Sequence, residues 1–134
     1  MAKILIVDDD LGLRSMLRIL LNTNGHETLI AEDGQEALEL IKQYTFDLMI
    51  TDLRMPHMDG LSLLRAVKAL ALSMPVILIT AYSSREAAAE AVELGAFAYV
   101  AKPFEINALM DTIGHALDAG KNITRTTGLP GGNG

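Results

Sequence analysis

Acidic side chains, one hydroxyl and one ammonium group stand directly after short apolar runs of this chain. They are Asp8, Asp9 and Asp10 after the first run, then Asp52, Thr80 and Lys102 after three later runs. Carboxylates that are held close together repel one another and resist joint ionisation. A hard divalent cation relieves that repulsion, and Mg²⁺ prefers oxygen ligands. These residue types therefore indicate an acidic site that binds Mg²⁺.

Phosphoryl transfer is the chemistry that these groups would support together. A carboxylate such as that of Asp52 can act as a covalent nucleophile. The charge on the oxygens of a transferred phosphoryl group must be matched, and Mg²⁺, Lys102 and the hydroxyl of Thr80 would each match one oxygen. The pattern favours transfer of a phosphoryl group to Asp52.

The elements that would position these residues alternate along the chain. Short apolar runs predict strands at Ile4–Val7, Glu27–Ala31, Leu48–Thr51, Val76–Ile79 and Phe97–Ala101. Helical periodicity predicts helices from Leu11, after Gly34, after Gly60, over Arg85–Leu94 and over Ile106–Leu117. Strands that are apolar throughout are buried on both faces. We therefore expect an α/β fold, a five-stranded parallel sheet doubly wound with five helices, whose ligands bind beyond the carboxyl ends of the strands.

Composition narrows the class of protein. The 134 residues suffice for one domain with a real core, and the formal net charge of −6 argues against direct nucleic-acid binding. There is no cysteine, which rules out disulfides and thiolate metal sites. No apolar run is long enough to span a membrane, so we expect a soluble, cytoplasmic protein. Residues 119–134, rich in Gly and Thr, are expected to form a flexible tail, the point at which an output domain was removed.

Four segments of the chain resemble the receiver (CheY-like) domain of two-component response regulators. They are Ile4–Asp10 (ILIVDDD), Ala31–Leu38 (AEDGQEAL), Asp47–Gly60 (DLMITDLRMPHMDG) and Lys102–Phe104 (KPF). The resemblance covers roughly residues 3–118, and it is specific because Thr80 and Lys102 also stand at the matching places. It implies a flavodoxin-like fold for residues 1–118.

The resemblance also implies a role for each site residue. Asp52 would take the phosphoryl group from a phosphohistidine of a sensor histidine kinase. The Mg²⁺ ion would be held by Asp9 directly, by Asp8 largely through water, by Asp52 and by the main-chain carbonyl of Arg54.

Further residues are assigned to the switch by the same resemblance. Thr80 and Tyr99 would be the switch pair, Lys102 would contact the phosphoryl oxygens, and the Lys102–Pro103 bond would be cis. Residues 84–118 would form the face that changes, with a homodimer, an output domain or a partner protein there and transcription regulation as the output. The chain would be a switch, not an enzyme, although it would catalyse its own phosphorylation and dephosphorylation.

Simpler interpretations stand beside these. Asp10 is expected to be the N-cap of the first helix, since aspartate favours that position. Tyr99 on a strand is compatible with plain packing.

Three competing functions agree less well with the sequence. A haloacid-dehalogenase-like phosphatase also carries Asp-x-Asp after its first strand, but it needs a second acidic cluster, and no acid follows Thr80 until Glu86. A flavodoxin-like cofactor binder is excluded because three aspartates would repel its phosphate. A degenerate, partner-binding receiver is not supported, since Asp52, Thr80 and Lys102 are all present.

Overall fold

The computed structural model describes residues 2–53, 58–70, 73–81 and 84–128, with side chains described as far as Ala119. In this part of the chain five parallel strands form one sheet in the order β2-β1-β3-β4-β5. The strands are β1 (Lys3–Val7), β2 (Glu27–Ala31), β3 (Leu48–Asp52), β4 (Val76–Thr80) and β5 (Ala98–Ala101). The predicted doubly wound parallel fold is confirmed.

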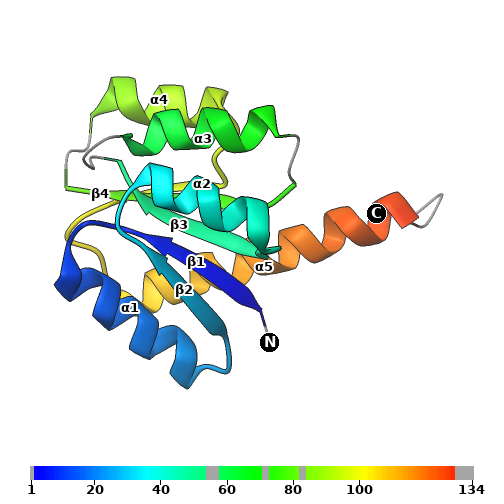
Figure 1. The fold of residues 1–134 in the computed structure, drawn as a ribbon, viewed down its shortest axis with the longest axis horizontal. Coiled ribbons are helices and arrows are strands. Elements are labelled where there is room, and N and C mark those ends of the chain that lie inside the picture. Colours follow the sequence, from blue (N-terminus) through cyan, green and yellow to red (C-terminus); the bar gives the residue numbers. More distant parts are fainter. Residues whose placement is uncertain (1, 54–57, 71–72, 82–83, 129–134) are drawn as a thin grey trace.

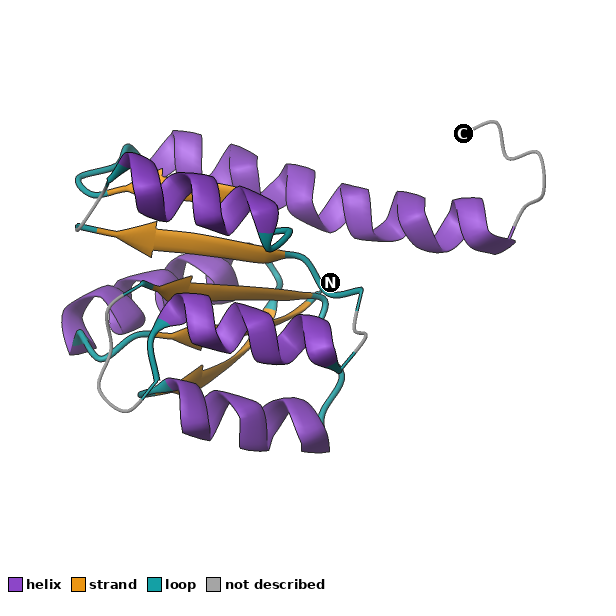
Figure 2. Ribbon diagram, turned by 90° about the horizontal axis from the view of Figure 1, so that it is seen from above, coloured by secondary structure: helices purple, strands orange, loops and turns teal. Residues whose placement is uncertain are grey.

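Helices cover both faces of the sheet (Figure 1). They are α1 (Leu11–Thr23), α2 (Gly34–Gln43), α3 (Gly60–Ala69), α4 (Arg85–Glu93) and α5 (Ile106–Gly128). Helices α1 and α5 lie on one face and α2, α3 and α4 on the other, as the view from above also shows (Figure 2). Each face has its own aliphatic core, because neighbouring residues of a strand point to opposite sides.

The alternation within strands decides which face each site residue meets. Along β3, Met49 packs with the cluster under α2–α4, whereas Leu48 and Ile50 pack with the cluster under α1 and α5. By the same alternation, Thr51 faces the side of α2–α4, and Asp52 faces the side of α1 and α5. The same reasoning places Asp8 on the side of α1 and α5, two residues beyond Ile6.

Polar residues cap the starts of the first four helices. Asp10 caps α1 by accepting hydrogen bonds from the N–H groups of Gly12 and Leu13, as predicted. Asp33, Asp59 and Ser84 cap α2, α3 and α4 in the same way. Such caps satisfy N–H groups that have no partner within the helix, so they fix where each helix begins after its strand.

The last helix differs from the prediction. We expected it to end at Leu117 and a flexible tail to begin at residue 119, but α5 continues to Gly128. The Gly and Thr content of this segment suggested a linker, yet both residues are tolerated in a helix at a cost of about 1 kcal/mol or less each, and the next proline is Pro130. Figure 2 shows this part of α5 running on beyond the sheet. The division into a domain of residues 1–118 and a tail stays a prediction.

No helix in the described residues is both long enough and apolar enough to traverse a membrane.

Candidate functional site

The predicted site residues come together at the carboxyl edge of the sheet. In the parallel ladders Val7 pairs with Thr51, Asp52 with Ile79, and Thr80 with Ala101. The ends of β1, β3, β4 and β5 therefore reach the same edge. Asp8 follows β1, Asp52 and Thr80 are the last residues of β3 and β4, and Lys102 follows β5.

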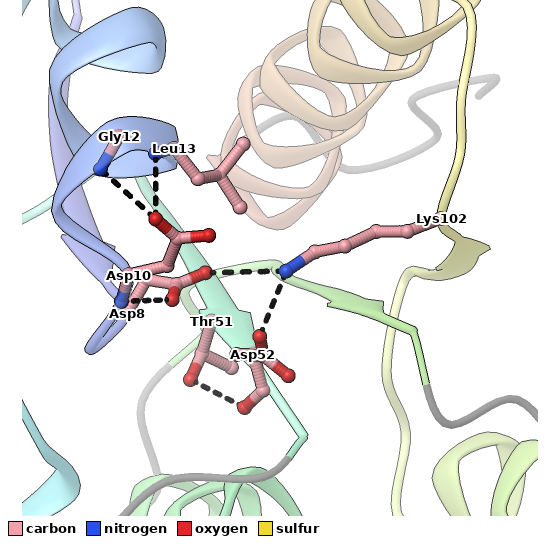
Figure 3. A network of polar contacts seen from close by, with 7 residues as sticks. All are labelled: Asp8, Asp10, Gly12, Leu13, Thr51, Asp52 and Lys102. Carbon is pink, nitrogen blue, oxygen red and sulfur yellow. Dashed lines mark hydrogen bonds and ion pairs between the residues drawn. The ribbon is translucent and has the colours of Figure 1, made fainter.

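Lys102 connects the two buried carboxylates of this edge (Figure 3). Its Nζ donates a hydrogen bond to Oδ2 of Asp52 over 3.0 Å and lies 3.8 Å from Oδ2 of Asp8. Burial works against the charge of Lys102, but the hydrogen bond to Asp52 and the attraction of Asp8 outweigh it, so the pKa of Lys102 lies above its ordinary value. The ammonium therefore stays charged and balances part of the acidic charge.

Asp8 is almost completely buried, at 2% exposure. Burial is the main cause that raises the pKa of Asp8 from 3.8 to about 6, and the charges of Asp52 and Asp9 add to it. The N–H of Asp10, which donates to Oδ1 of Asp8 over 2.7 Å, and the charge of Lys102 oppose the rise. The charge of Lys102 therefore does not bring the pKa of Asp8 back to its ordinary value.

The main chain of Asp52 is also held. Asp52 is buried at the end of β3, and its carbonyl oxygen accepts a hydrogen bond from the Thr51 hydroxyl over 3.0 Å (Figure 3). Sequence reasoning missed Thr51, which it counted as an ordinary strand residue. The signal that would have found it is a hydroxyl at the end of an otherwise aliphatic run.

Thr80 and Tyr99 lie on the neighbouring strands. Thr80 is fully buried, and its carbonyl accepts a hydrogen bond from the N–H of Lys102 over 2.8 Å. Tyr99 pairs with Leu78 in the ladder, and its half-buried side chain packs against the core under α2–α4. Thr80 therefore lies on β4, the strand next to the one that carries Asp52, whereas Tyr99 lies one strand further away on β5. Their role as a switch pair stays a prediction.

Two other residues complete the sequence-based set. Asp9 is exposed next to Asp8 at the edge of the site. Arg54, predicted to offer its main-chain carbonyl to the metal, lies outside the described residues. The predicted cis bond between Lys102 and Pro103 is present.

The carboxyl edge of the sheet carries the oxygen donors that Mg²⁺ prefers. Asp8 and Asp52 come from the ends of adjacent strands, and both are buried carboxylates. In residues 2–53, 58–70, 73–81 and 84–128 there is no group of three or more His, Asp or Glu side chains that could hold an ion. Mg²⁺ commonly takes one or two carboxylates and keeps several waters, so a pair of carboxylates is a sufficient protein contribution.

This arrangement matches a known family. The model of the response regulator receiver domain matches residues 4–114. The chain belongs to the receiver domain family. The transcriptional regulatory protein ZraR of Escherichia coli K12 is 42% identical over 114 residues, which are 85% of this chain and 26% of that protein. The sporulation initiation phosphotransferase F of Bacillus subtilis is 38% identical over 111 residues, which are 83% of this chain and 90% of that protein.

Solved structures agree with this assignment. The crystal structure of NtrX from Brucella abortus superposes with a TM-score of 0.90 at 31% identity, over 99% of this chain and 30% of that one. The chain spans about a quarter of the length of ZraR, the curated relative described above.

Proposed function

We propose that this receiver domain accepts a phosphoryl group on Asp52 from a sensor histidine kinase, in a reaction that depends on Mg²⁺. The single observation that carries the proposal is the contact of Lys102 Nζ with Asp52 Oδ2 at 3.0 Å, beside the second buried carboxylate of Asp8. Phosphoryl transfer to a carboxylate needs a nucleophilic carboxylate next to a fixed ammonium and a second acidic group, and these residues provide all three.

Different residues of the chain would have separate roles in the transfer of the phosphoryl group. A carboxylate oxygen of Asp52 attacks the phosphorus atom, and the bond from phosphorus to the histidine nitrogen of the kinase breaks. Lys102 already stands beside that carboxylate and offers its charge to an oxygen of the incoming group. Asp8, Asp9, Asp52 and the main-chain carbonyl of Arg54 would hold the Mg²⁺ ion. When bound, Mg²⁺ supplies positive charge that lowers the repulsion between the carboxylates and the phosphoryl oxygens.

The product would be a changed surface, not a released molecule. A phosphoryl group adds about −1.5 to −2 of charge, which the Thr80 hydroxyl and Lys102 can engage only when the group is present. This differential contact would bias two states of the domain, with Tyr99 following Thr80. In this sense the domain is a switch that promotes its own phosphorylation and dephosphorylation, and it does not turn over a separate substrate.

The face formed by α4, β5 and α5 is the part proposed to change. Helix α4 is lightly anchored, since Ala91 is its one fully buried residue and Arg65 of α3 forms an exposed ion pair with its Glu90. A homodimer, an output domain or a partner protein would read this face. Transcription regulation is the proposed output, supported by the similarity to the transcriptional regulatory protein ZraR. The charge of −6 disfavours direct DNA contact by this domain.

The test is intact-mass spectrometry after incubation with acetyl phosphate, with Mg²⁺ or with EDTA. A mass gain of one phosphoryl group is expected for the wild type with Mg²⁺ and for Asp111→Asn, a matched control that changes an exposed aspartate of α5. No gain is expected for Asp52→Asn or with EDTA. Absence of the adduct in the wild type, together with no binding of beryllofluoride, would overturn the proposal. Steady release of phosphate from a simple monoester would instead indicate a phosphatase.

A further inference from the structure

We propose that Thr51 is a positioning residue for the phosphoacceptor, and that it acts by holding the main-chain carbonyl of Asp52. The inference rests on the proposed function and adds a residue to it. Thr51 is 1% exposed, and its position in β3 pairs with Val7 of β1 and Leu78 of β4. Both of these neighbours belong to the aliphatic core under α2–α4.

The hydroxyl group of Thr51 is unexpected among these buried aliphatic neighbours. Valine has nearly the same shape as threonine and would suit the aliphatic surroundings, whereas a buried hydroxyl is unfavourable unless it forms a hydrogen bond. The Thr51 hydroxyl donates to the carbonyl oxygen of Asp52 over 3.0 Å (Figure 3). It thus holds the peptide group at which the chain leaves β3.

Gly60 restrains the same carbonyl from another element. It is the first residue of α3, and a Cβ atom at this position would lie only 2.3 Å from the carbonyl oxygen of Asp52. The N–H of Gly60 donates to the carbonyl of Leu53 over 2.8 Å, which ties the start of α3 to the chain just after Asp52. The Asp52 carbonyl is therefore packed against Gly60 while Thr51 bonds to it.

Holding this carbonyl controls the direction of the carboxylate. The hydrogen bond runs from the residue before Asp52 to the carbonyl of Asp52 itself, so it limits rotation about both main-chain bonds of the Asp52 Cα atom and thereby fixes the direction in which the side chain leaves it. The carboxylate now lies 3.0 Å from Lys102 Nζ, a separation that a small rotation would lose. Reacting groups are sensitive to such displacements, and about 1 Å can cost about 100-fold in rate.

Two pairs of variants isolate the hydroxyl. Wild-type Thr51 against Thr51→Val, and Thr51→Ser against Thr51→Ala, each differ mainly in that one group. We would measure the rate of phosphorylation over a range of acetyl phosphate concentrations at saturating Mg²⁺, and the thermal unfolding midpoint of each variant. In each pair the member without a hydroxyl should show a maximal rate lower by about 10-fold or more, with the half-saturating concentration little changed. Thr51→Ser should recover most of the rate lost in Thr51→Ala.

The outcomes distinguish a failure of the positioning role of Thr51 from a failure of the proposed function. Equal maximal rates within a pair of folded proteins would overturn the positioning role, while a phosphorylated wild type would leave the proposed function standing. Should Thr51→Val fail to fold, the Ser and Ala pair decides the question alone. A rate that falls only in proportion to a lowered unfolding midpoint would mean a structural role and would also overturn the inference. A wild type that takes up no phosphoryl group would remove the proposed function, and this inference with it.

Discussion

Lys102 donates a hydrogen bond from Nζ to Oδ2 of Asp52 over 3.0 Å, although the two residues lie 50 positions apart in the sequence. Parallel pairing of β3 with β4 and of β4 with β5 brings them together, because the carboxyl ends of all three strands reach one edge. The positive charge therefore already lies beside the carboxylate that we propose as the phosphoryl acceptor. Preorganised charge of this kind costs no rearrangement during reaction.

Removal of the Lys102 charge should slow phosphorylation strongly. For Lys102→Gln we expect a rate with acetyl phosphate that is lower by about 100-fold, the usual effect of losing one group that stabilises developing charge. Lys42→Gln, which changes an exposed lysine of α2, is the control and should react like the wild type. Phosphorylation time courses by intact mass check this. A Lys102→Gln rate within twofold of the wild type would show that the contact in the structure is not used in the reaction.

The stability of the metal-free protein should fall as pH rises through the pKa of Asp8. Its folded-state pKa of about 6 exceeds the ordinary 3.8, so the folded state binds the proton more tightly than the unfolded state. The resulting stabilisation is fully present below pH 3.8 and is lost as pH rises through about 6. The two pKa values together set its upper limit at about 3 kcal/mol.

Urea unfolding at several pH values in EDTA measures this effect of Asp8. Asp8→Asn should remove the decline, because an amide stays neutral and can still accept the N–H of Asp10. Asp47→Asn, at an exposed aspartate, should keep it. A decline of equal size in Asp8→Asn would assign the effect to other groups.

Gly60 should tolerate no side chain. The Cβ of Gly60→Ala would meet main-chain and core atoms, with the Asp52 oxygen at 2.3 Å and Leu78 Cδ2 at 3.0 Å. Neither α3 nor β3 can move freely, so we expect a loss of about 1–3 kcal/mol in the free energy of unfolding. The matched control is Gly114→Ala in α5, where nothing lies within 4 Å, and it should stabilise the fold by about 1 kcal/mol. Equal stability of the two variants in urea would show that the contact at Gly60 is relieved easily.

Residue types predicted much of this fold, because each strand is a short apolar run and a polar residue marks where most of the runs end. The aliphatic run from Ile4 to Val7 stops at acidic residues, and the same logic located Asp52 and Lys102 at one edge. Two features escaped this reasoning. The proposed role of Thr51 depends on the face of β3 to which it points and on a hydrogen bond from its side chain to the main chain, and its residue type reveals neither. The length of α5 escaped as well, since composition beyond Leu117 suggested a linker while no proline interrupts the helix before residue 130.

The part of α5 beyond Ala119 should contribute little to the stability of the receiver domain. The buried side chains of the described part of α5 are Leu109, Ile113 and Ala116, and the helix then runs on past the sheet (Figure 2). A chain that stops after Ala119 should therefore unfold in urea within about 0.5 kcal/mol of the full chain and lose helical circular dichroism. A chain that stops after Met110 lacks Ile113 and Ala116, and it should lose at least about 2–5 kcal/mol. If the chain ending at Ala119 were as unstable as the one ending at Met110, the domain boundary near residue 118 would be wrong, and the whole helix would belong to the folded unit.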